Sequence, residues 1–472
     1  MKEFINRKVE LDALEAEYKR AEASFVVIYG RRRTGKTALI REFIKDKKSI
    51  YFLATEENET QNKNLFRQVV ARGLNNQLLK EAEGASWESI FDAVASTNLS
   101  ERIILVIDEF QYLERSSKGF SSLVNRIWEG KLQGRNVMLI LCGSYVSMMK
   151  DLTLNYNSPL YGRRTAQINL HPLSFESYMG FFPGQNLDRV LNYYALTGGI
   201  PKYAEIFSDT KDLYKAIEKN IVFRSSYLYE EPKFLLQNET RDVGTYFSIL
   251  RSIAAGNKKL SDIASQLEIK QTNLSKPLEI LIELDILERD VPVTEKNPER
   301  SKKGLYFIKD NYIRFWFRYI YPFESYIESG QTAFVMEQIK KTYRQEHMGI
   351  VYEGVCKDLM YHLSSKGLWD FDFAKVGRWW INSGEEIDIA AISLDNKKIV
   401  FGECKYSTSK KGTSILMRLE NKVKNTKAAE DVEAFYVIFS QGGFTEELKE
   451  FADKNKHVKL LTLESALGII LN

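Results

Sequence analysis

Residues 25–44, Phe-Val-Val-Ile-Tyr-Gly-Arg-Arg-Arg-Thr-Gly-Lys-Thr-Ala-Leu-Ile-Arg-Glu-Phe-Ile, decide the fold of the first half of this chain. Gly30 and Gly35, with a Lys-Thr pair directly after the second glycine, satisfy the pattern G-x-x-x-x-G-K-[ST] without a mismatch. The residues before Gly30 are apolar and β-branched, as in a buried parallel strand, and those after the Lys-Thr pair have helical spacing. The stretch therefore predicts a strand, a tight turn and a helix in that order.

Residues 30–37, which we call the glycine loop, have the pattern of a phosphate cradle. A strand, a glycine turn and a helix aim several backbone N–H groups and the positive end of the helix dipole at an anion. Lys36 then reaches the β- and γ-phosphates of a nucleotide, and the Thr37 hydroxyl ligates Mg²⁺. The alternative is a glycine turn with a chance Lys-Thr pair, which the flanking strand and helix disfavour. The nucleotide-binding residues that we expect are Gly30, Arg31, Arg32, Arg33, Thr34, Gly35, Lys36 and Thr37.

A pair of acids follows a second buried strand. The apolar run 103–107 ends in Asp108-Glu109. At the end of a strand beside a phosphate cradle, one carboxylate holds Mg²⁺ through water and a second polarises an attacking water. We therefore expect Asp108 to be the metal residue and Glu109 the catalytic base. Two solvated acids would be the interpretation if the pair stood alone.

Two further polar features follow the acid pair. The apolar strand 136–144 ends in Ser144, which either senses the γ-phosphate or caps the strand. The loop 159–164 carries Arg163 and Arg164. Either arginine would neutralise charge on the transferred phosphate, from its own subunit or from a neighbouring one. A surface arginine pair is the equal alternative.

The N-terminal residues 4–14 predict a helix. Asn6 is the candidate N-cap, and Glu10 is placed to complement the helix dipole. Val9 occupies the position where a capping box has an acid, so the start signal is incomplete.

Composition narrows the class of protein. No apolar run approaches the roughly 18 residues that span a bilayer, and the first residues lack the apolar core of a signal peptide. We therefore expect a cytoplasmic protein without a membrane partner. Three widely spaced cysteines argue against a disulfide framework and a zinc knuckle. The net charge of +4 neither demands nor excludes nucleic acid, so a binding surface must be local.

The middle third has the pattern of a winged helix-turn-helix. Three short amphipathic segments, 246–254, 259–267 and 272–284, precede a charged hairpin. The wing, residues 294–303, has four basic residues against two acidic ones, which suits a DNA backbone. Only Lys270 and Lys276 lie near the start of the third segment, and such modules also bind proteins, so both partners stay open.

Residues 310–322 are dense in aromatic side chains. Stacking on nucleic-acid bases is conceivable for such a run. A packed seam between domains is favoured, because large aromatics dominate cores and interfaces.

A second set of chemical residues lies near the C-terminus. Two apolar strands are expected over 385–392 and 398–406, joined by a turn. Glu403 and Lys405 are two apart and project to the same face, where Asp388 meets them from the adjacent strand. The two carboxylates would hold a divalent metal, and the lysine would position or deprotonate a water. This pattern suits phosphodiester hydrolysis; a solvated strand face is the alternative.

Basic residues gather just after this pattern. A cationic patch beside a metal site attracts a phosphate backbone, although charge runs on helices are usually only solvated faces. Glu420 is the single acid among seven basic residues, which are Lys405, Lys410, Lys411, Arg418, Lys422, Lys424 and Lys427.

The first 230 residues resemble the archaeal-type ATPase family, a branch near the AAA+ and STAND ATPases. The stretches that carry the resemblance are 4–11, 30–37, 106–111, 142–144, 158–163 and 197–201. The resemblance implies an α/β P-loop NTPase with a parallel sheet, with ATP and Mg²⁺ as cofactors. It also implies a helical lid that contains residues 198–201 and moves when ATP is hydrolysed.

The C-terminal pattern resembles the PD-(D/E)XK nuclease superfamily. Together with residues 305–320 it is similar to a C-terminal domain that often follows archaeal-type ATPases. The resemblance assigns Asp388, Glu403 and Lys405 to the signature and Glu353 to its helical acid. Ile387 replaces the signature proline, and an inactive nuclease-like domain is the alternative.

These inferences divide the chain into five parts. They are an ATPase core (1–175), a helical lid (176–237), a winged helix-turn-helix (238–308), an aromatic-rich linker (309–345) and an α/β restriction-endonuclease-like domain (346–472). We expect an ATP-hydrolysing protein that couples nucleotide state to a DNA-associated, Mg²⁺-dependent nuclease-like domain. The alternative is a nucleotide-dependent regulator whose nuclease-like domain does not cut, and assembly into a homo-oligomer stays open.

Overall fold

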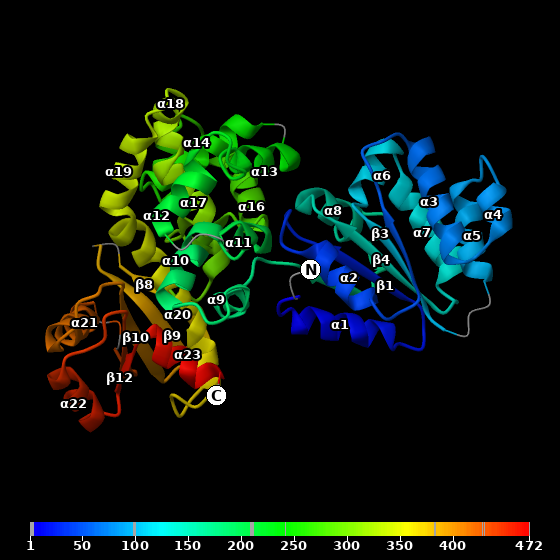
Figure 1. Cartoon of the computed structure of the whole chain (residues 1–472). Helices are drawn as coiled ribbons and strands as arrows, with labels where there is room; N and C mark the ends of the chain where they lie inside the picture. The colour runs from blue at the N-terminus through cyan, green and yellow to red at the C-terminus, as the bar shows by residue number, and fades with distance from the viewer. Residues whose placement is uncertain are drawn as a thin grey trace. The chain divides into compact units, whose positions relative to one another are not determined.

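The computed structural model describes residues 4–97, 101–207, 212–240, 242–381, 384–426, 428 and 430–471. The chain forms two compact units, shown in Figure 1. The N-terminal unit comprises Met1–Phe181 with two later segments, Ile200–Glu205 and Lys233–Arg241. The C-terminal unit comprises Phe182–Gly199, Ile206–Pro232 and Asp242–Asn472. The chain therefore returns twice to the N-terminal unit after first leaving it.

The N-terminal unit is built on a five-stranded parallel sheet with the order β2-β3-β4-β1-β5. Its strands are β1 (Ser24–Tyr29), β2 (Ser49–Leu53), β3 (Ile103–Asp108), β4 (Val137–Gly143) and β5 (Ala166–Asn169). Every residue of β1, β3 and β4 is buried. Continuous apolar strands of this kind form the centre of a parallel sheet that is covered on both faces.

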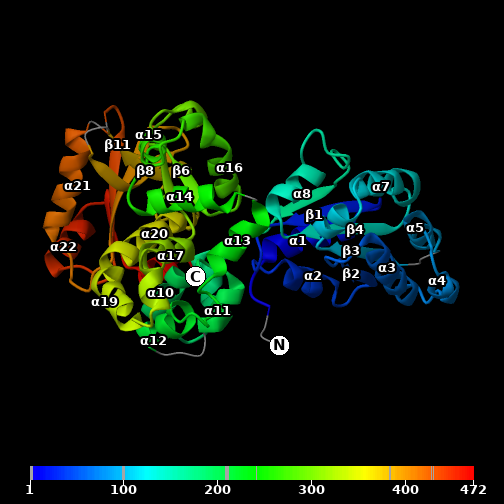
Figure 2. The same ribbon diagram turned by 90° about the horizontal axis from the view of Figure 1, so that it is seen from above.

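Helices cover both faces of this sheet, as Figures 1 and 2 show. On one face, Leu14 and Leu39 form a core with Val26. On the other face, the ring centres of Phe52 and Phe66 lie 5.1 Å apart. The main helices are α1 (Lys8–Tyr18), α2 (Lys36–Ile44), α3 (Glu59–Gly73), α4 (Gln77–Glu81), α5 (Trp87–Ser96), α6 (Gln111–Ser116), α7 (Phe120–Ile127) and α8 (Val146–Thr153).

The helix expected over 4–14 is present as α1, but its expected start and its Asn6 cap are wrong. Helix α1 begins at Lys8, because Asn6 and Arg7 have left-handed backbone conformations, with φ of 56° and 70°. The Arg7 guanidinium donates to the carbonyls of Thr34, at 3.0 Å, and His171, at 2.7 Å. The residues before α1 therefore anchor the glycine loop.

The C-terminal unit starts with helices α10 (Leu187–Thr197) and α12 (Leu213–Ile217). Three helices follow, α14 (Val243–Ala254), α15 (Leu260–Gln266) and α16 (Ser275–Glu283). They precede an antiparallel hairpin of β6 (Leu287–Asp290) and β7 (Leu305–Ile308). This order of elements is the one that the sequence pattern of the middle third predicts.

The aromatic run forms helix α17 (Asn311–Tyr319) inside the C-terminal unit. Trp316 is fully buried, and its indole N–H donates to the Tyr229 carbonyl at 2.7 Å. A buried indole with a partner is a core residue. Helices α18 (Glu324–Glu328) and α19 (Thr332–Thr342) follow. The five-part division of the chain stays a prediction.

A second five-stranded sheet, with the order β12-β11-β10-β9-β8, completes the C-terminal unit. Its strands are β8 (Phe373–Trp380), β9 (Glu386–Ser393), β10 (Lys398–Lys405), β11 (Glu433–Ser440) and β12 (Val458–Leu461). Strands β8, β9 and β10 are antiparallel, and β10, β11 and β12 are parallel. Helices α20 (Met348–Ser365), α21 (Thr413–Asn425), α22 (Glu446–Lys454) and α23 (Leu463–Leu471) pack around it (Figure 1).

Within the described residues, none of the helices combines the length and the apolar character that a membrane span requires.

Candidate functional site

The glycine loop lies between β1 and α2, where the sequence predicts it. Its shape depends on positive φ angles at Gly30 (149°), Arg33 (70°) and Gly35 (97°). A Cβ on Gly30 would lie 2.4 Å from the Leu170 carbonyl oxygen, so no larger residue fits there without a backbone shift. Helix α2 begins at Lys36, and its first N–H groups have no partner within the helix. The loop thus offers backbone donors at the carboxyl edge of the sheet.

The Lys36 side chain folds over the glycine loop. Its ammonium donates to the carbonyls of Gly30, at 2.7 Å, and Arg31, at 2.9 Å. Thr34 adds a hydrogen bond from its hydroxyl to the same Arg31 carbonyl, at 2.9 Å. Burial lowers the pKa of the Lys36 ammonium. When a phosphate chain is bound, its oxygens would replace these two carbonyls as partners of the Lys36 ammonium.

Asp108, at the end of β3, meets Thr37 of α2. The Thr37 hydroxyl donates to Oδ2 of Asp108 at 2.9 Å, and the Tyr51 hydroxyl donates to the same oxygen at 2.5 Å. The other oxygen, Oδ1, accepts from the Glu109 backbone N–H at 2.9 Å. A hydroxyl and a fixed carboxylate side by side suit Mg²⁺, which takes few protein oxygens and keeps several waters. Tyr51 belongs to no motif in the sequence, because its link to Asp108 depends on the pairing of β2 with β3.

Glu109 and Ser144 are brought together at the adjacent ends of β3 and β4. The Ser144 hydroxyl donates to Oε2 of Glu109 at 2.7 Å. Gln111, which the sequence analysis did not single out, donates to the same Glu109 oxygen and also to the Ser144 hydroxyl oxygen, at 3.3 Å. Glu109 has a left-handed backbone, with φ of 55°. Such a conformation in a non-glycine residue often accompanies a functional site.

Arg163 does not reach the glycine loop of its own chain. It precedes β5, whose first residue pairs with Val26 near the start of β1, so Arg163 lies toward the opposite edge of the sheet. Its guanidinium pairs with Glu129 and donates from Nε to Asn125 at 2.9 Å. Arg163 is therefore not placed to act on a phosphate at its own glycine loop, and a role at a neighbouring subunit stays a prediction beside the equal alternative of a surface arginine.

The C-terminal candidate residues meet on β9 and β10. Oδ2 of Asp388 accepts from the backbone N–H of Cys404, between Glu403 and Lys405, at 2.8 Å. The Lys405 ammonium lies 2.6 Å from Oε1 of Glu403. Lys422 of α21, which the sequence analysis counted only as part of a basic patch, lies 3.2 Å from Oε2. Two ammonium groups therefore hold the Glu403 carboxylate.

A register irregularity in the sheet lies opposite Asp388. Gly377 pairs with Ala390 and Trp379 with Ile387, so Arg378 alone lies opposite two residues, Asp388 and Ile389. Bulges of this kind re-aim a side chain and are common beside active sites. No period-2 pattern in the sequence reports such a bulge.

Glu353 of α20 belongs to the same group of charges. Burial, with the nearby Asp388 carboxylate, raises the pKa of Glu353 to about 7. Burial and the Glu403 carboxylate raise the pKa of Asp388 to about 6. Arg378 approaches Glu353 at 4.0 Å and Asp290 of the β6–β7 hairpin at 3.4 Å. Acids crowded in this way are typical of sites that bind a cation or move a proton.

Both sites present oxygen donors, but few of them come from acidic side chains that converge on one point. Across the described ranges, no three His, Cys, Asp or Glu side chains converge as a ready-made metal site. The donors fit Mg²⁺ at Thr37 and Asp108. At Asp388 and Glu403 the donors are also carboxylate oxygens, and a divalent ion there would displace the ammonium groups from Glu403.

The basic residues after β10 lie around α21. Arg418 and Lys424 are exposed on this helix, and Lys422 faces Glu403. Lys410 is exposed in the preceding loop. Lys427 lies outside the described residues.

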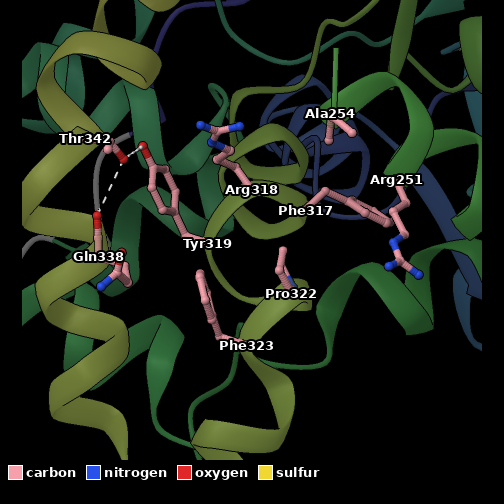
Figure 3. A pocket seen from close by; sticks show the side chains of 10 residues that line it. Arg251, Ala254, Phe317, Arg318, Tyr319, Pro322, Phe323, Gln338 and Thr342 are labelled. Atoms are coloured by element: carbon pink, nitrogen blue, oxygen red, sulfur yellow. Dashed lines mark hydrogen bonds between the residues drawn. The ribbon is translucent and has the colours of Figure 1, made fainter. Parts of the chain in front are cut away.

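A separate cavity of about 340 Å³ lies in the C-terminal unit, lined by α14, α17 and α19 (Figure 3). Its wall includes Phe317, Pro322 and Phe323, with the Thr342 hydroxyl donating to the Tyr319 hydroxyl at 3.0 Å. Its lining has no carboxylate and none of the predicted site residues. We assign it no role in the chemistry above.

The parallel sheet, the glycine loop at its carboxyl edge and the Thr37–Asp108 pair define the N-terminal unit as an α/β P-loop NTPase domain. Comparison with known proteins agrees. Residues 4–207 match an ATPase domain predominantly from Archaea, and residues 316–416 match a domain of archaeal and bacterial proteins of unknown function. The chain is 36% identical over 436 residues to the uncharacterized protein MJECL04 of Methanocaldococcus jannaschii, covering 92% of this chain and 95% of that protein. It therefore belongs to the archaeal ATPase family.

Two further proteins are similar to this chain. The uncharacterized ATP-binding protein MJ0423 of Methanocaldococcus jannaschii is 49% identical over 45 residues, which are 10% of this chain and 76% of that protein. The Walker-type ATPase PABY2304 of Pyrococcus abyssi superposes with a TM-score of 0.51 at 22% identity, covering 67% of this chain and 96% of that one. The second likeness concerns the fold alone.

Proposed function

We propose that the N-terminal unit hydrolyses ATP in a Mg²⁺-dependent reaction. The observation that carries this proposal is the convergence of Thr37, Asp108, Glu109 and Ser144 at the carboxyl edge of one parallel sheet, next to the glycine loop. A nucleotide loop without an acid pair could only bind. Here the acids that the reaction needs stand beside it.

Each residue has a separate task in this reaction. The glycine-loop N–H groups and Lys36 bind the phosphates, and Thr37 with Asp108 holds the metal ion. Mg²⁺, when bound, neutralises charge on the phosphates. Glu109 orients the attacking water and accepts its proton, while the Ser144 hydroxyl, 2.7 Å away, keeps that carboxylate in place.

Phosphate release from ATP by the full-length chain tests the proposal. We expect turnover with Mg²⁺, none with EDTA, and a return of activity when Mg²⁺ is restored. A panel of single-stranded, duplex and branched nucleic acids, added in parallel, shows whether the C-terminal unit affects the rate. Nucleotide binding without any phosphate release under these conditions would contradict hydrolysis.

We propose as a second function that the C-terminal unit cleaves phosphodiester bonds in DNA with a divalent metal. The support is the cluster of Asp388, Glu403, Lys405 and Glu353. The pKa values of Glu353 and Asp388 are raised, and the Lys405 ammonium pairs with the Glu403 carboxylate. Helices α14–α16 with the β6–β7 hairpin would act as a winged helix that contacts DNA. The rival proposal is a nucleotide-dependent regulator whose C-terminal domain binds without cutting.

Matched variants separate the two proposals. Asp388→Asn and Lys405→Ala should abolish cleavage of plasmid and branched DNA in Mg²⁺ or Mn²⁺. Asp453→Asn, which neutralises an exposed acid on α22, should cleave like the wild type. If the wild type cleaves nothing, or if both site variants cleave fully, the nuclease proposal fails and the regulator proposal remains.

A further inference from the structure

The last turn of α13 (Glu231–Glu239) is attached to the strand end that carries Ser144. Residues 233–241 belong to the N-terminal unit, although the chain on both sides belongs to the C-terminal unit. Oε1 of Glu239 accepts from the Val146 backbone N–H at 3.0 Å, and Oε2 from that of Ser147 at 3.4 Å. A carboxylate from a distant part of the chain thus caps α8 two residues after Ser144.

A second link joins the same turn to the glycine loop. The Arg32 guanidinium donates to the hydroxyls of Tyr112, at 2.8 Å, and Tyr145, at 3.2 Å. The Tyr145 hydroxyl in turn donates to Oδ1 of Asn238 at 3.2 Å. Arg32 also lies 5.1 Å from the centre of the Tyr145 ring. Arg32 of the glycine loop is therefore linked to Asn238 of α13 through the Tyr145 hydroxyl.

Glu239 follows Asn238, which the Tyr145 hydroxyl links to Arg32, and the charges of Arg32 and Lys36 act on the Glu239 carboxylate through space. Burial raises the pKa of Glu239, while its hydrogen bonds to α8 and the charges of Lys36 and Arg32 oppose this shift. Lys36 and Arg32 belong to the loop that would bind the negative phosphates. A carboxylate and a phosphate chain that share two cations destabilise one another in a buried setting.

We infer that Glu239 senses the nucleotide state, because its carboxylate and the γ-phosphate compete for Lys36 and Arg32. The inference rests on the proposed ATP site and adds the regulation of that site. ATP weakens the capping of α8 by Glu239 and loosens the last turn of α13, whereas ADP, which lacks the third phosphate and its charge, weakens the cap much less. The chain leaves the N-terminal unit at residue 242, so a loosened α13 changes the tether that leads into the C-terminal unit.

Reciprocity gives the inference a binding signature. If ATP weakens the Glu239 cap, the cap weakens ATP binding by the same factor. Removing the Glu239 charge should therefore strengthen ATP binding. Glu239→Gln keeps one acceptor for the Val146 N–H but removes the charge. We expect about tenfold tighter binding of the Mg²⁺ complex of adenylyl imidodiphosphate, within the usual range of such couplings, and a much smaller effect on ADP. Glu230→Gln, at an exposed acid just before α13, is the control and should bind both nucleotides like the wild type.

Amide hydrogen exchange of the full-length chain tests whether ATP weakens the Glu239 cap. We expect adenylyl imidodiphosphate with Mg²⁺ to speed amide exchange in residues 146–147 and 234–240, and ADP with Mg²⁺ to speed it much less. Glu239→Gln should show the faster exchange without nucleotide. Binding by the wild type is measured first, since failure to bind ATP contradicts the proposed function. Two results would overturn the role of Glu239. One is normal binding in which the ratio of the affinities for adenylyl imidodiphosphate and ADP is the same in the wild type and in Glu239→Gln. The other is amide exchange that is the same with both nucleotides.

Discussion

The hydroxyl of Thr37 donates a 2.9 Å hydrogen bond to the carboxylate of Asp108, 71 residues further along the chain. The bond joins the first turn of α2 to the end of β3. It places a hydroxyl and a carboxylate on the same side of the glycine loop. The parallel sheet thus fixes the two groups that we propose as Mg²⁺ ligands.

Thr37→Ala should lower kcat for ATP hydrolysis by about 100-fold, the effect of losing one preorganised electrostatic contact in an active site. The hydroxyl is lost while Asp108 keeps its bonds to Tyr51 and the Glu109 N–H. Thr37→Ser is the control, because it retains the hydroxyl and should retain most of the activity. Steady-state rates across a Mg²⁺ titration measure both. An unchanged Mg²⁺ dependence in Thr37→Ala would show that the hydroxyl is no ligand.

Glu109→Gln should bind ATP but hydrolyse it at least about 100-fold more slowly, because an amide cannot accept the proton of water. Single-turnover measurement and retention of labelled ATP on a filter separate binding from hydrolysis. Ser144→Ala should have a smaller effect, since it removes one of two donors that orient the Glu109 carboxylate. Undiminished turnover in Glu109→Gln would assign the base to another residue.

Arg163→Ala should leave ATP turnover unchanged and lower the free energy of unfolding by no more than about 1 kcal/mol, as for an exposed ion pair. Its partners, Glu129 and Asn125, lie in or next to α7 of the same chain, away from the glycine loop. Turnover and chemical unfolding of the variant measure the two effects. A loss of turnover that mixing with Lys36→Ala restores would instead place Arg163 at the active site of a neighbouring subunit.

Asp388→Asn should stabilise the C-terminal unit at pH 8 but not at pH 4. The pKa of Asp388 is raised from 3.8 to about 6, so between these values the folded chain holds a proton that the unfolded chain has lost. Stability therefore falls as pH rises through this window, and the deprotonated site costs about 1–3 kcal/mol at pH 8. Calorimetric unfolding at both pH values measures the effect. Equal shifts in Tm at pH 4 and pH 8 would contradict an elevated pKa.

Local patterns in the sequence were sufficient to predict those parts of the fold and of the sites that depend on residues close together in the chain. The strand, turn and helix over 25–44 and the acids after β3 are of this kind. So is the hairpin of β9 and β10, whose turn contains Asn396 with a φ of 58°. In a parallel sheet the carboxyl ends of the strands share one edge, so Asp108 was expected at the same edge as the glycine loop.

Contacts between distant segments could not be predicted in this way. Glu239 caps α8 from 93 residues away, and Lys422 reaches Glu403 from a helix whose charges fit a solvated face equally well. The left-handed Asn6 and Arg7 broke a helical pattern because Arg7 bonds to the carbonyls of Thr34 and His171. In each case tertiary partners outweighed the local signal.

The most direct test of phosphate chemistry at the glycine loop compares ATP hydrolysis by the wild type, Lys36→Ala and Lys45→Ala, each as the full-length chain with saturating Mg²⁺. Lys45 is the matched control, because it is exposed at the end of the same helix, α2. We expect Lys36→Ala to lose hydrolysis and Lys45→Ala to turn over at the wild-type rate. Wild-type turnover in Lys36→Ala would contradict the assignment of the glycine loop as the ATP site.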